Sequence, residues 1–386
     1  MVRHARPVRV GSRILLAAAA VIAVAVGVGL VAFSRDDDQG SAPVSLPTVP
    51  TSSGPPPPAP SVSAVPSAPA SSAPAPAGAE TASSNATIST LDGTALYVDP
   101  TGAAAQQVKD YQASGQAENA TTIRKIADRP VATWFADSSA GGVTRARALV
   151  TAAGRAGKVP VLTLYNIPNR DCSGQSAGGA ANAGEYRGWI DGMAGALRGQ
   201  KALVVLEPDA MPHAVEAGCL DDGGRAERYE LLGYAIDKLR ANNGVSVYLD
   251  AGNPTWITDT GQMAGALRQA GIERASGFSL NVANFETTAS NVQYGTALSG
   301  QLGGARFVID TSRNGNGPAA RGPIGNEHWC NPAGRKLGDL PTTETGTALV
   351  DAYLWIKRPG ESDGACGNGA PPAGQWWADY ALGLAS

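Results

Sequence analysis

The stretch Ala202-Leu-Val-Val-Leu-Glu-Pro-Asp209 gives the clearest indication of a fold in this chain. A short, continuous apolar run predicts a strand buried on both faces, as strands of parallel sheets are. Pro208 has no N–H to donate to a neighbouring strand, so we expect pairing to stop there. Glu207 and Asp209 would then follow a buried strand, where ligands bind in parallel α/β proteins. A solvated acidic turn is the structural alternative for this stretch taken alone.

Similar apolar runs recur along the rest of the chain and alternate with stretches of helical spacing. Strands are expected at 95–98, 131–135, 159–164, 202–206, 245–249, 277–280, 307–309 and 352–356. Helices are expected at 142–156, 186–197, 226–241 and 260–270. Repeated strand-then-helix order predicts a parallel sheet with helical crossovers. Seven or eight such units favour a barrel over an open sheet.

The first part of the chain is expected to lie outside the folded domain. Within residues 1–40, four arginines precede the uncharged segment 14–33, which is long enough to span a bilayer. A signal peptide and an N-terminal membrane anchor both fit, and either places the remainder outside the cytoplasm. Residues 41–86 are rich in Pro, Ala and Ser, which predicts a disordered linker. Residues 87–386 are long enough to form one domain.

Charge and cysteine content restrict the class of partner. The net charge is −3 and only 16% of residues are charged, so we expect no nucleic-acid surface. Four cysteines in an exported chain indicate two disulfides, with three possible pairings. Cys172–Cys219 with Cys330–Cys366 is favoured, because each bond would clamp a loop near an acidic residue. The cysteines are far apart and the three histidines lack ligand spacing, so we expect no metal.

Polar or aromatic side chains follow most of the expected strands. At the carboxyl ends of a barrel they would converge into a polar cleft, although any single one could be a helix cap or turn residue. The residues are Trp134, Tyr165, Glu207, Asp209, Asp250, Asn281, Asp310 and Lys357.

The tryptophans fall into two groups. Trp134, Trp256 and Trp329 lie in loops or at strand ends, where flat rings suit the apolar faces of sugars. Trp189 and Trp355 are expected to fill the core.

Several chemistries are excluded by the motifs that are present or missing. There is no G-x-S-x-G or H-E-x-x-H motif, and the expected domain has only two histidines. Residues 315–320 match a loosened G-x-G-x-x-A pattern, but Pro318 and Pro323 oppose the helix that nucleotide binding needs. Carboxylates remain, and glycoside hydrolysis needs only a protonated acid, a second carboxylate and no cofactor.

The chain resembles glycoside hydrolase family 6, the inverting β-1,4-glucanases and cellobiohydrolases, and is most similar to actinobacterial endoglucanase-like members. Five segments match in family order, namely 164–172, 205–209, 248–252, 308–318 and 354–364. The resemblance implies an α/β fold, a distorted, incomplete TIM-like barrel with about seven parallel strands. The two disulfides of the family also match the favoured pairing.

The resemblance also implies roles for individual residues. Asp209 would be the general acid, Asp171 would share its proton and tune it, and Asp363 would be the catalytic base. Tyr165 would crowd the sugar at the cleavage point. Sugar-binding residues would be Trp134, Trp256, Asn284, Trp329, Lys357 and Glu361, with Asp250 in support.

Two positions depart from the family pattern. Ala177 stands where a water-holding serine is common, so Ser176 would take that role, and Asn253 stands where histidine is common. The chain is short for the loops that roof a cellobiohydrolase tunnel, which favours an open cleft. We therefore expect a monomeric, inverting endo-β-1,4-glucanase (cellulase) that acts on β-1,4-glucan and touches a membrane only through its N-terminal segment. A non-catalytic cell-wall glycan-binding protein on the same fold is the alternative.

Overall fold

The computed structural model describes residue 91 and residues 93–322, 328–367 and 369–386. These residues all belong to one compact unit, Thr81–Ser386. The expected signal or anchor segment 1–40 and linker 41–86 lie outside the described residues. Within the described ranges, no helix combines the length and apolar character needed to cross a bilayer.

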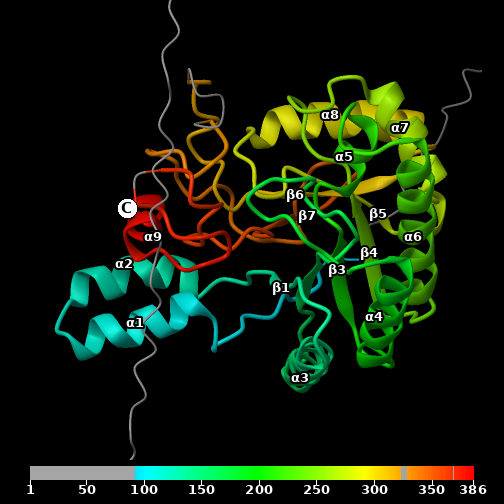
Figure 1. The fold of residues 1–386 in the computed structure, drawn as a ribbon. Helices are drawn as coiled ribbons and strands as arrows, with labels where there is room; N and C mark the ends of the chain where they lie inside the picture. The colour runs from blue at the N-terminus through cyan, green and yellow to red at the C-terminus, as the bar shows by residue number, and fades with distance from the viewer. Residues whose placement is uncertain (1–90, 92, 323–327, 368) are drawn as a thin grey trace, which may run out of the picture. The chain divides into compact units, whose positions relative to one another are not determined.

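Seven parallel strands form a single sheet, in which each strand pairs with the next one along the chain (Figure 1). The strands are β1 (Thr133–Phe135), β2 (Val161–Leu164), β3 (Ala202–Leu206), β4 (Val245–Asp250), β5 (Gly277–Leu280), β6 (Arg306–Asp310) and β7 (Val350–Leu354). The prediction of a further strand at 95–98 is wrong. Only Leu96 forms a bridge there, to Val159, because β1 takes up the same edge of β2 from Leu162 onward.

The sheet curls until its two edge strands meet. Val131, just before β1, forms a parallel bridge with Trp355, just after β7. The N–H of Ala132 donates to the carbonyl of Trp355 at 2.9 Å. The indole N–H of Trp134 donates to the carbonyl of Ile356 at 2.8 Å. Because the edges are joined at this place alone among the described residues, the fold is a distorted, incomplete barrel, as the sequence predicted.

Helices connect the strands and cover the outside of the sheet. They are α1 (Ala103–Ala113), α2 (Ala117–Ala127), α3 (Ala140–Arg155), α4 (Ala183–Ala196), α5 (Ala210–Val215), α6 (Asp222–Arg240), α7 (Thr260–Gln269), the 3-10 helix η1 (Ile272–Arg274), α8 (Thr288–Gln301) and α9 (Ala378–Ala385). The four expected helices correspond to α3, α4, α6 and α7. In Figure 1, α4 and α6 lie side by side next to β3 and β4, and α1 and α2 lie near α9.

Short polar side chains explain where many of these helices begin. The side chain before the first helical residue accepts a backbone N–H from the first turn, which satisfies a donor that the helix itself cannot. This cap is found for α3, α4, α6, α7 and α8, at Ser139, Asn182, Asp221, Asp259 and Thr287.

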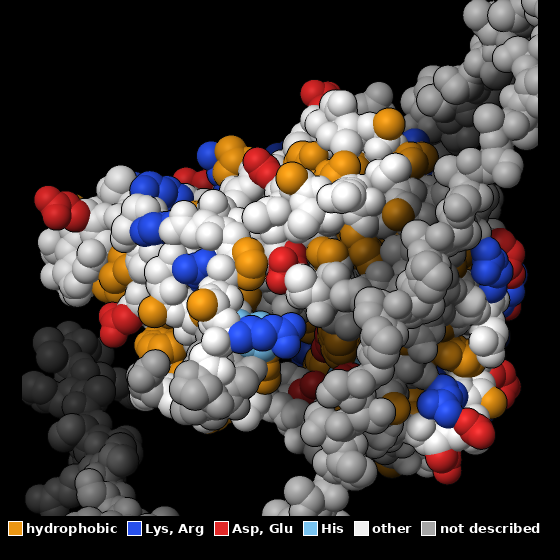
Figure 2. Space-filling model, turned by 90° about the horizontal axis from the view of Figure 1, so that it is seen from above, with side chains coloured by type: hydrophobic (Ala, Val, Ile, Leu, Met, Phe, Trp, Pro, Cys, Tyr) orange, Lys and Arg blue, Asp and Glu red, His pale blue; other side chains and the backbone are white. Residues whose placement is uncertain are grey.

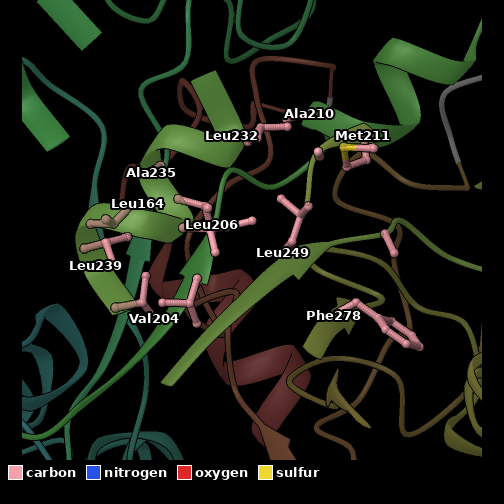
Figure 3. Close-up of a cluster of buried hydrophobic side chains, with 14 of the residues drawn as sticks. Leu164, Val204, Leu206, Ala210, Met211, Leu232, Ala235, Leu239, Leu249 and Phe278 are labelled. Atoms are coloured by element: carbon pink, nitrogen blue, oxygen red, sulfur yellow. The ribbon is translucent and has the colours of Figure 1, made fainter. Parts of the chain in front are cut away.

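The run 202–206 is buried on both faces because a separate apolar cluster lies on each side of the sheet. Val204 and Leu206 face the helices and pack in a cluster with Leu232 and Leu249 (Figure 3). Leu203 and Val205 face the inside of the barrel. This arrangement confirms the prediction of a doubly buried strand. Trp189 and Trp355, which are 5% and 1% exposed, also fill the core as expected.

We expect Leu249→Ala to lower the free energy of unfolding by about 2–5 kcal/mol, because it leaves a cavity between β4 and the helices. Urea unfolding followed by tryptophan fluorescence measures this change. Leu340→Ala is the matched control, since Leu340 is 51% exposed. It should change stability by less than about 0.5 kcal/mol. Equal effects of the two substitutions would contradict the assignment of Leu249 to the core.

Candidate active site

A cleft of about 800 Å³ lies at the carboxyl ends of the strands. Figure 2 shows acidic and apolar side chains inside a hollow on one face of the molecule, with basic side chains at its edge. The structure brings together in the cleft wall the residues that the sequence singled out, although they come from distant segments. They are Trp134, Tyr165, Asp171, Ser176, Asp209, Trp256, Asn284, Trp329, Lys357, Glu361 and Asp363.

Other strand-end residues are buried below the cleft, and the expectation that they form its wall is wrong. Glu207, Asn281 and Asp310 are each 0% exposed, and Asp250 is 1% exposed. Their side chains hold loops in place. The carboxylate of Glu207 accepts the backbone N–H groups of Asn166 and Ile167 at 2.8 and 3.0 Å.

Asp209 is held in an unusual backbone conformation at the floor of the cleft. Its φ is 68°, in the left-handed region that non-glycine residues rarely adopt. The backbone N–H of Asp209 donates to Oδ2 of Asp250 at 2.9 Å. The hydroxyl of Tyr165 donates to Oδ2 of Asp209 at 3.0 Å. These bonds fix both the main chain and the carboxyl group.

Burial raises the pKa of Asp209 to about 6. The nearby negative charge of Asp171 raises the pKa further, whereas His213, the Tyr165 hydrogen bond and Lys357 lower it. Burial, and then the charge of Asp209, raise the pKa of Asp250 to about 8. Asp209 therefore keeps its proton in mildly acidic solution, where an exposed aspartate would have lost it.

Asp171 lies in the loop between β2 and α4. One carboxylate oxygen, Oδ2, accepts the backbone N–H of Ser176 at 2.6 Å. The disulfide Cys172–Cys219, with Cα atoms 5.6 Å apart, links this loop to the segment that follows α5. Since α5 begins directly after Asp209, the disulfide helps to keep Asp171 near Asp209.

Asp363 is surrounded by positive charge. Arg313 Nη1 lies 2.8 Å from its Oδ2, and Lys357 Nζ lies 3.1 Å from its Oδ1. Burial alone would raise the pKa of Asp363, but the two cations outweigh it and lower the pKa below its usual range. Asp363 is therefore ionised at any pH at which the protein would work. The second disulfide, Cys330–Cys366, closes the surrounding loops, so both predicted pairings are confirmed.

Asn253 has a local structural role. Its Oδ1 accepts the backbone N–H groups of Thr255 and Trp256 at 3.0 and 3.1 Å. Such a turn holds the loop that presents the Trp256 ring to the cleft. Asn253 therefore helps to position the Trp256 ring in the cleft wall.

Sequence reasoning assigned no role to Arg313 or His213. Arg313 is 0% exposed and lies over the ring of Phe285, with its guanidinium carbon 4.3 Å from the ring centroid. His213 lines the cleft one helical turn after Asp209. The four-residue spacing from Asp209 could have revealed His213 had α5 been predicted.

A single group in the described part of the chain has the proximity that metal binding needs, namely Cys172, His213 and Cys219. Both sulfurs are joined in a disulfide, so neither is available as a thiolate ligand. This group does not fit a metal centre.

A curled sheet of parallel strands with carboxylates at its carboxyl ends defines an α/β-barrel protein with a hydrolase-like cleft. The sequence profile of Glycosyl hydrolases family 6 matches residues 91–386. This chain belongs to that family.

Individual relatives agree with the family match. Endoglucanase A of Cellulomonas fimi is 42% identical over 294 residues, which cover 75% of this chain and 60% of that protein. Endoglucanase 1 of Streptomyces halstedii is 41% identical and is covered over 87% of its length. The solved endoglucanase Cel6 of Mycobacterium tuberculosis, in complex with methyl-cellobiosyl-4-deoxy-4-thio-beta-D-cellobioside, is 44% identical with a TM-score of 0.71. Its match covers 76% of this chain and 97% of that one.

We expect Arg313→Met to lower the free energy of unfolding by about 3 kcal/mol or more, because it deprives the buried Asp363 carboxylate of one of its cations. Arg145→Met is the matched control. Arg145 pairs with Asp137 at the surface, with side chains 57% and 48% exposed, and its loss should cost less than about 1 kcal/mol. Urea unfolding measures both. Similar losses in the two variants would contradict a structural role for the buried pair.

Proposed function

We propose that this protein is an endo-β-1,4-glucanase that hydrolyses internal bonds of cellulose-like glucans with inversion. The observation that carries the proposal is the pairing of two differently tuned carboxyl groups in one cleft. Asp209 has a raised pKa and can donate a proton, whereas Asp363 remains ionised. Such a pair is what inverting glycoside hydrolysis requires. The endoglucanase relatives support the same activity.

In the proposed mechanism Asp209 gives its proton to the glycosidic oxygen as the bond from that oxygen to the anomeric carbon breaks. A water molecule attacks the anomeric carbon from the opposite face and gives up its own proton to a base. The negative charge of Asp171 raises the pKa of Asp209 and so helps it to hold its proton until the bond breaks.

Tyr165 is proposed to crowd the sugar ring at the cleavage point and to favour a distorted ring. Its hydroxyl is bonded to Asp209, and its ring meets that of Trp134 edge-on with centroids 5.3 Å apart. These contacts hold the ring directly beside the acid, where crowding would act on the sugar that is being cleaved.

Asp363 is the proposed base, because it stays ionised and faces the cleft. The cations beside Asp363 also weaken it as a proton acceptor. Asp363 is proposed to lie too far from the attacking water for direct contact and to act through a second water. Asp171 is the competing acceptor, with Ser176 beside it in the cleft wall. Ser176 would help to hold the water in the absence of a serine at position 177.

The remaining cleft residues suit a polysaccharide. Aromatic rings in the wall offer apolar faces for stacking, and polar groups beside them can bind hydroxyls. The proposed sugar-binding residues are Trp134, Trp256, Asn284, Trp329, Lys357 and Glu361. We further propose that the protein works as a monomer, without a cofactor, outside the cytoplasm, where its two disulfides are stable.

We expect Asp209→Ala to reduce hydrolysis of carboxymethylcellulose by about 10²–10⁴-fold, since general acid catalysis contributes that much. Cleavage of an aryl cellotrioside with a good leaving group should fall much less, because that group departs without protonation. Asp237→Asn is the control, since Asp237 lies in a surface ion pair with Arg274. Equal rates of the variant and the unaltered enzyme on both substrates would remove Asp209 as the acid. No reducing-sugar release by the unaltered protein would favour a glycan-binding protein.

Asp363→Ala and Asp171→Ala separate the two candidate bases. If Asp363 is the base, its alanine variant should lose activity, and azide should restore turnover by forming a glycosyl azide of inverted configuration. Asp171→Ala should then lose activity without azide rescue, because its charge supports Asp209. Proton NMR of the products measures the configuration. Full activity of Asp363→Ala without azide would exclude Asp363 as the base, and rescue of Asp171→Ala alone would assign the role to Asp171.

A further inference from the structure

Asn331 contacts the proposed base, Asp363, although it comes from a different segment of the chain. Among the described residues, those that line the cleft include Asp363 but not Asn331. The φ of Asn331 is 49°, in the left-handed region that asparagine adopts more readily than most non-glycine residues. Such a backbone persists only where the surroundings hold it in place, so the contacts of Asn331 are informative.

The side-chain amide of Asn331 holds the main chain on both sides of the Asp363 side chain. Its Oδ1 accepts the backbone N–H of Asp363 at 2.7 Å. Its Nδ2 donates to the carbonyl of Gly364 at 2.9 Å and to Oγ of Ser362 at 3.2 Å. A single planar amide supplies both the acceptor and the donor, so the loop is fixed at the residue that carries the base.

The main chain of Asn331 also holds the carboxyl group of Asp363. Its backbone N–H donates to Oδ2 of Asp363 at 3.0 Å, and Arg313 Nη1 donates to the same oxygen at 2.8 Å. The bonds between Asn331 and Asp363 are therefore reciprocal, because the backbone N–H of each residue meets a side-chain oxygen of the other. A shift of Asn331 would move both the main chain and the carboxyl group of Asp363.

A covalent bond joins the same two segments. Cys330 directly precedes Asn331, and its disulfide partner Cys366 follows Gly364 by two residues. The disulfide therefore keeps the amide of Asn331 within reach of the loop that it bridges. Arg313 and Lys357 provide the charges that pair with the carboxylate of Asp363, whereas Asn331 fixes the backbone from which that carboxylate extends.

We propose that Asn331 is a positioning residue that holds Asp363 in the place and orientation required of the base. This inference rests on the proposed role of Asp363. Asn331 acts through Asp363 and not on the glucan, so its removal should slow the chemical step and leave binding of the glucan nearly unchanged. Displacement of a reacting group by about 1 Å can cost about 10²-fold in rate.

The test is a double-mutant cycle, with kcat and KM measured on soluble carboxymethylcellulose. Asn331→Gly removes the amide and adopts the left-handed backbone without strain. It should lower kcat by about 10–100-fold and change KM by less than about twofold. In an Asp363→Ala background the same substitution should lower kcat by less than about twofold, because the residue through which Asn331 acts is already missing.

Asn242→Gly is the matched control. Asn242 precedes β4, at the end of the sheet opposite the cleft, and its Nδ2 donates to the carbonyl of Ala194 at 3.2 Å. Its loss removes a similar bond from side chain to backbone, which should lower the free energy of unfolding by about 1 kcal/mol. The kcat of this control should be unchanged, so lower stability by itself would not reproduce the effect expected of Asn331→Gly.

A second variant guards against misfolding of the first. Asn331→Ala deletes the same side-chain bonds and leaves the unfolded chain less flexible than glycine does. It should reproduce the loss of kcat and the nearly unchanged KM. Circular dichroism and thermal unfolding check that each variant is folded at the assay temperature.

The outcomes separate this inference from the proposed function. An unchanged kcat in Asn331→Gly, a loss confined to KM, or losses that multiply in the double variant would overturn the role of Asn331. Full activity of Asp363→Ala would overturn the assignment of Asp363 as the base, and this inference with it. An inactive but folded unaltered protein would overturn the proposed function itself.

Discussion

Burial of carboxylates beneath the strand ends is the constraint on which the rest of the molecule depends. Glu207 and Asp310 accept backbone N–H groups from the loops that follow neighbouring strands, and Asp250 accepts the N–H of Asp209 itself. Buried acceptors are costly unless they are satisfied, so each of these bonds specifies one loop conformation. The cleft therefore keeps its shape through polar contacts below its floor, while the aromatic rings above remain available for ligand.

Two aspartates in the same cleft have opposite electrostatic surroundings. Asp209 is buried next to another carboxylate and has a raised pKa, whereas Asp363 is buried next to Arg313 and Lys357 and has a lowered pKa. Burial acts in the same direction on both, so the neighbouring charges decide the difference. The difference in pKa between chemically identical side chains thus follows from their neighbours, as it does in enzymes that use paired carboxyl groups.

Periodicity predicted the parallel sheet well, because a doubly buried strand needs apolar residues on both faces and Ala202–Leu206 supplies them. It failed at 95–98, where a few apolar residues suggested a strand but β1 takes up the edge of β2 just beyond the bridge to Val159. The cleft was predicted from polar residues that follow strands, yet Asn281 and Asp310 are buried. Spacing along a strand shows which residues reach its end but not how deeply each one is covered.

The amino-acid sequence by itself determined the fold class, the family and the set of candidate carboxylates, since apolar patterning and local motifs are properties of short segments. Tertiary structure alone decided which carboxyl group has a raised pKa and which has a lowered one. That distinction depends on Asp171 and His213 near Asp209, and on Arg313 near Asp363. Asp363 and Arg313 are 50 residues apart in the chain. Electrostatic interactions act through space, so only the folded chain shows which charges meet.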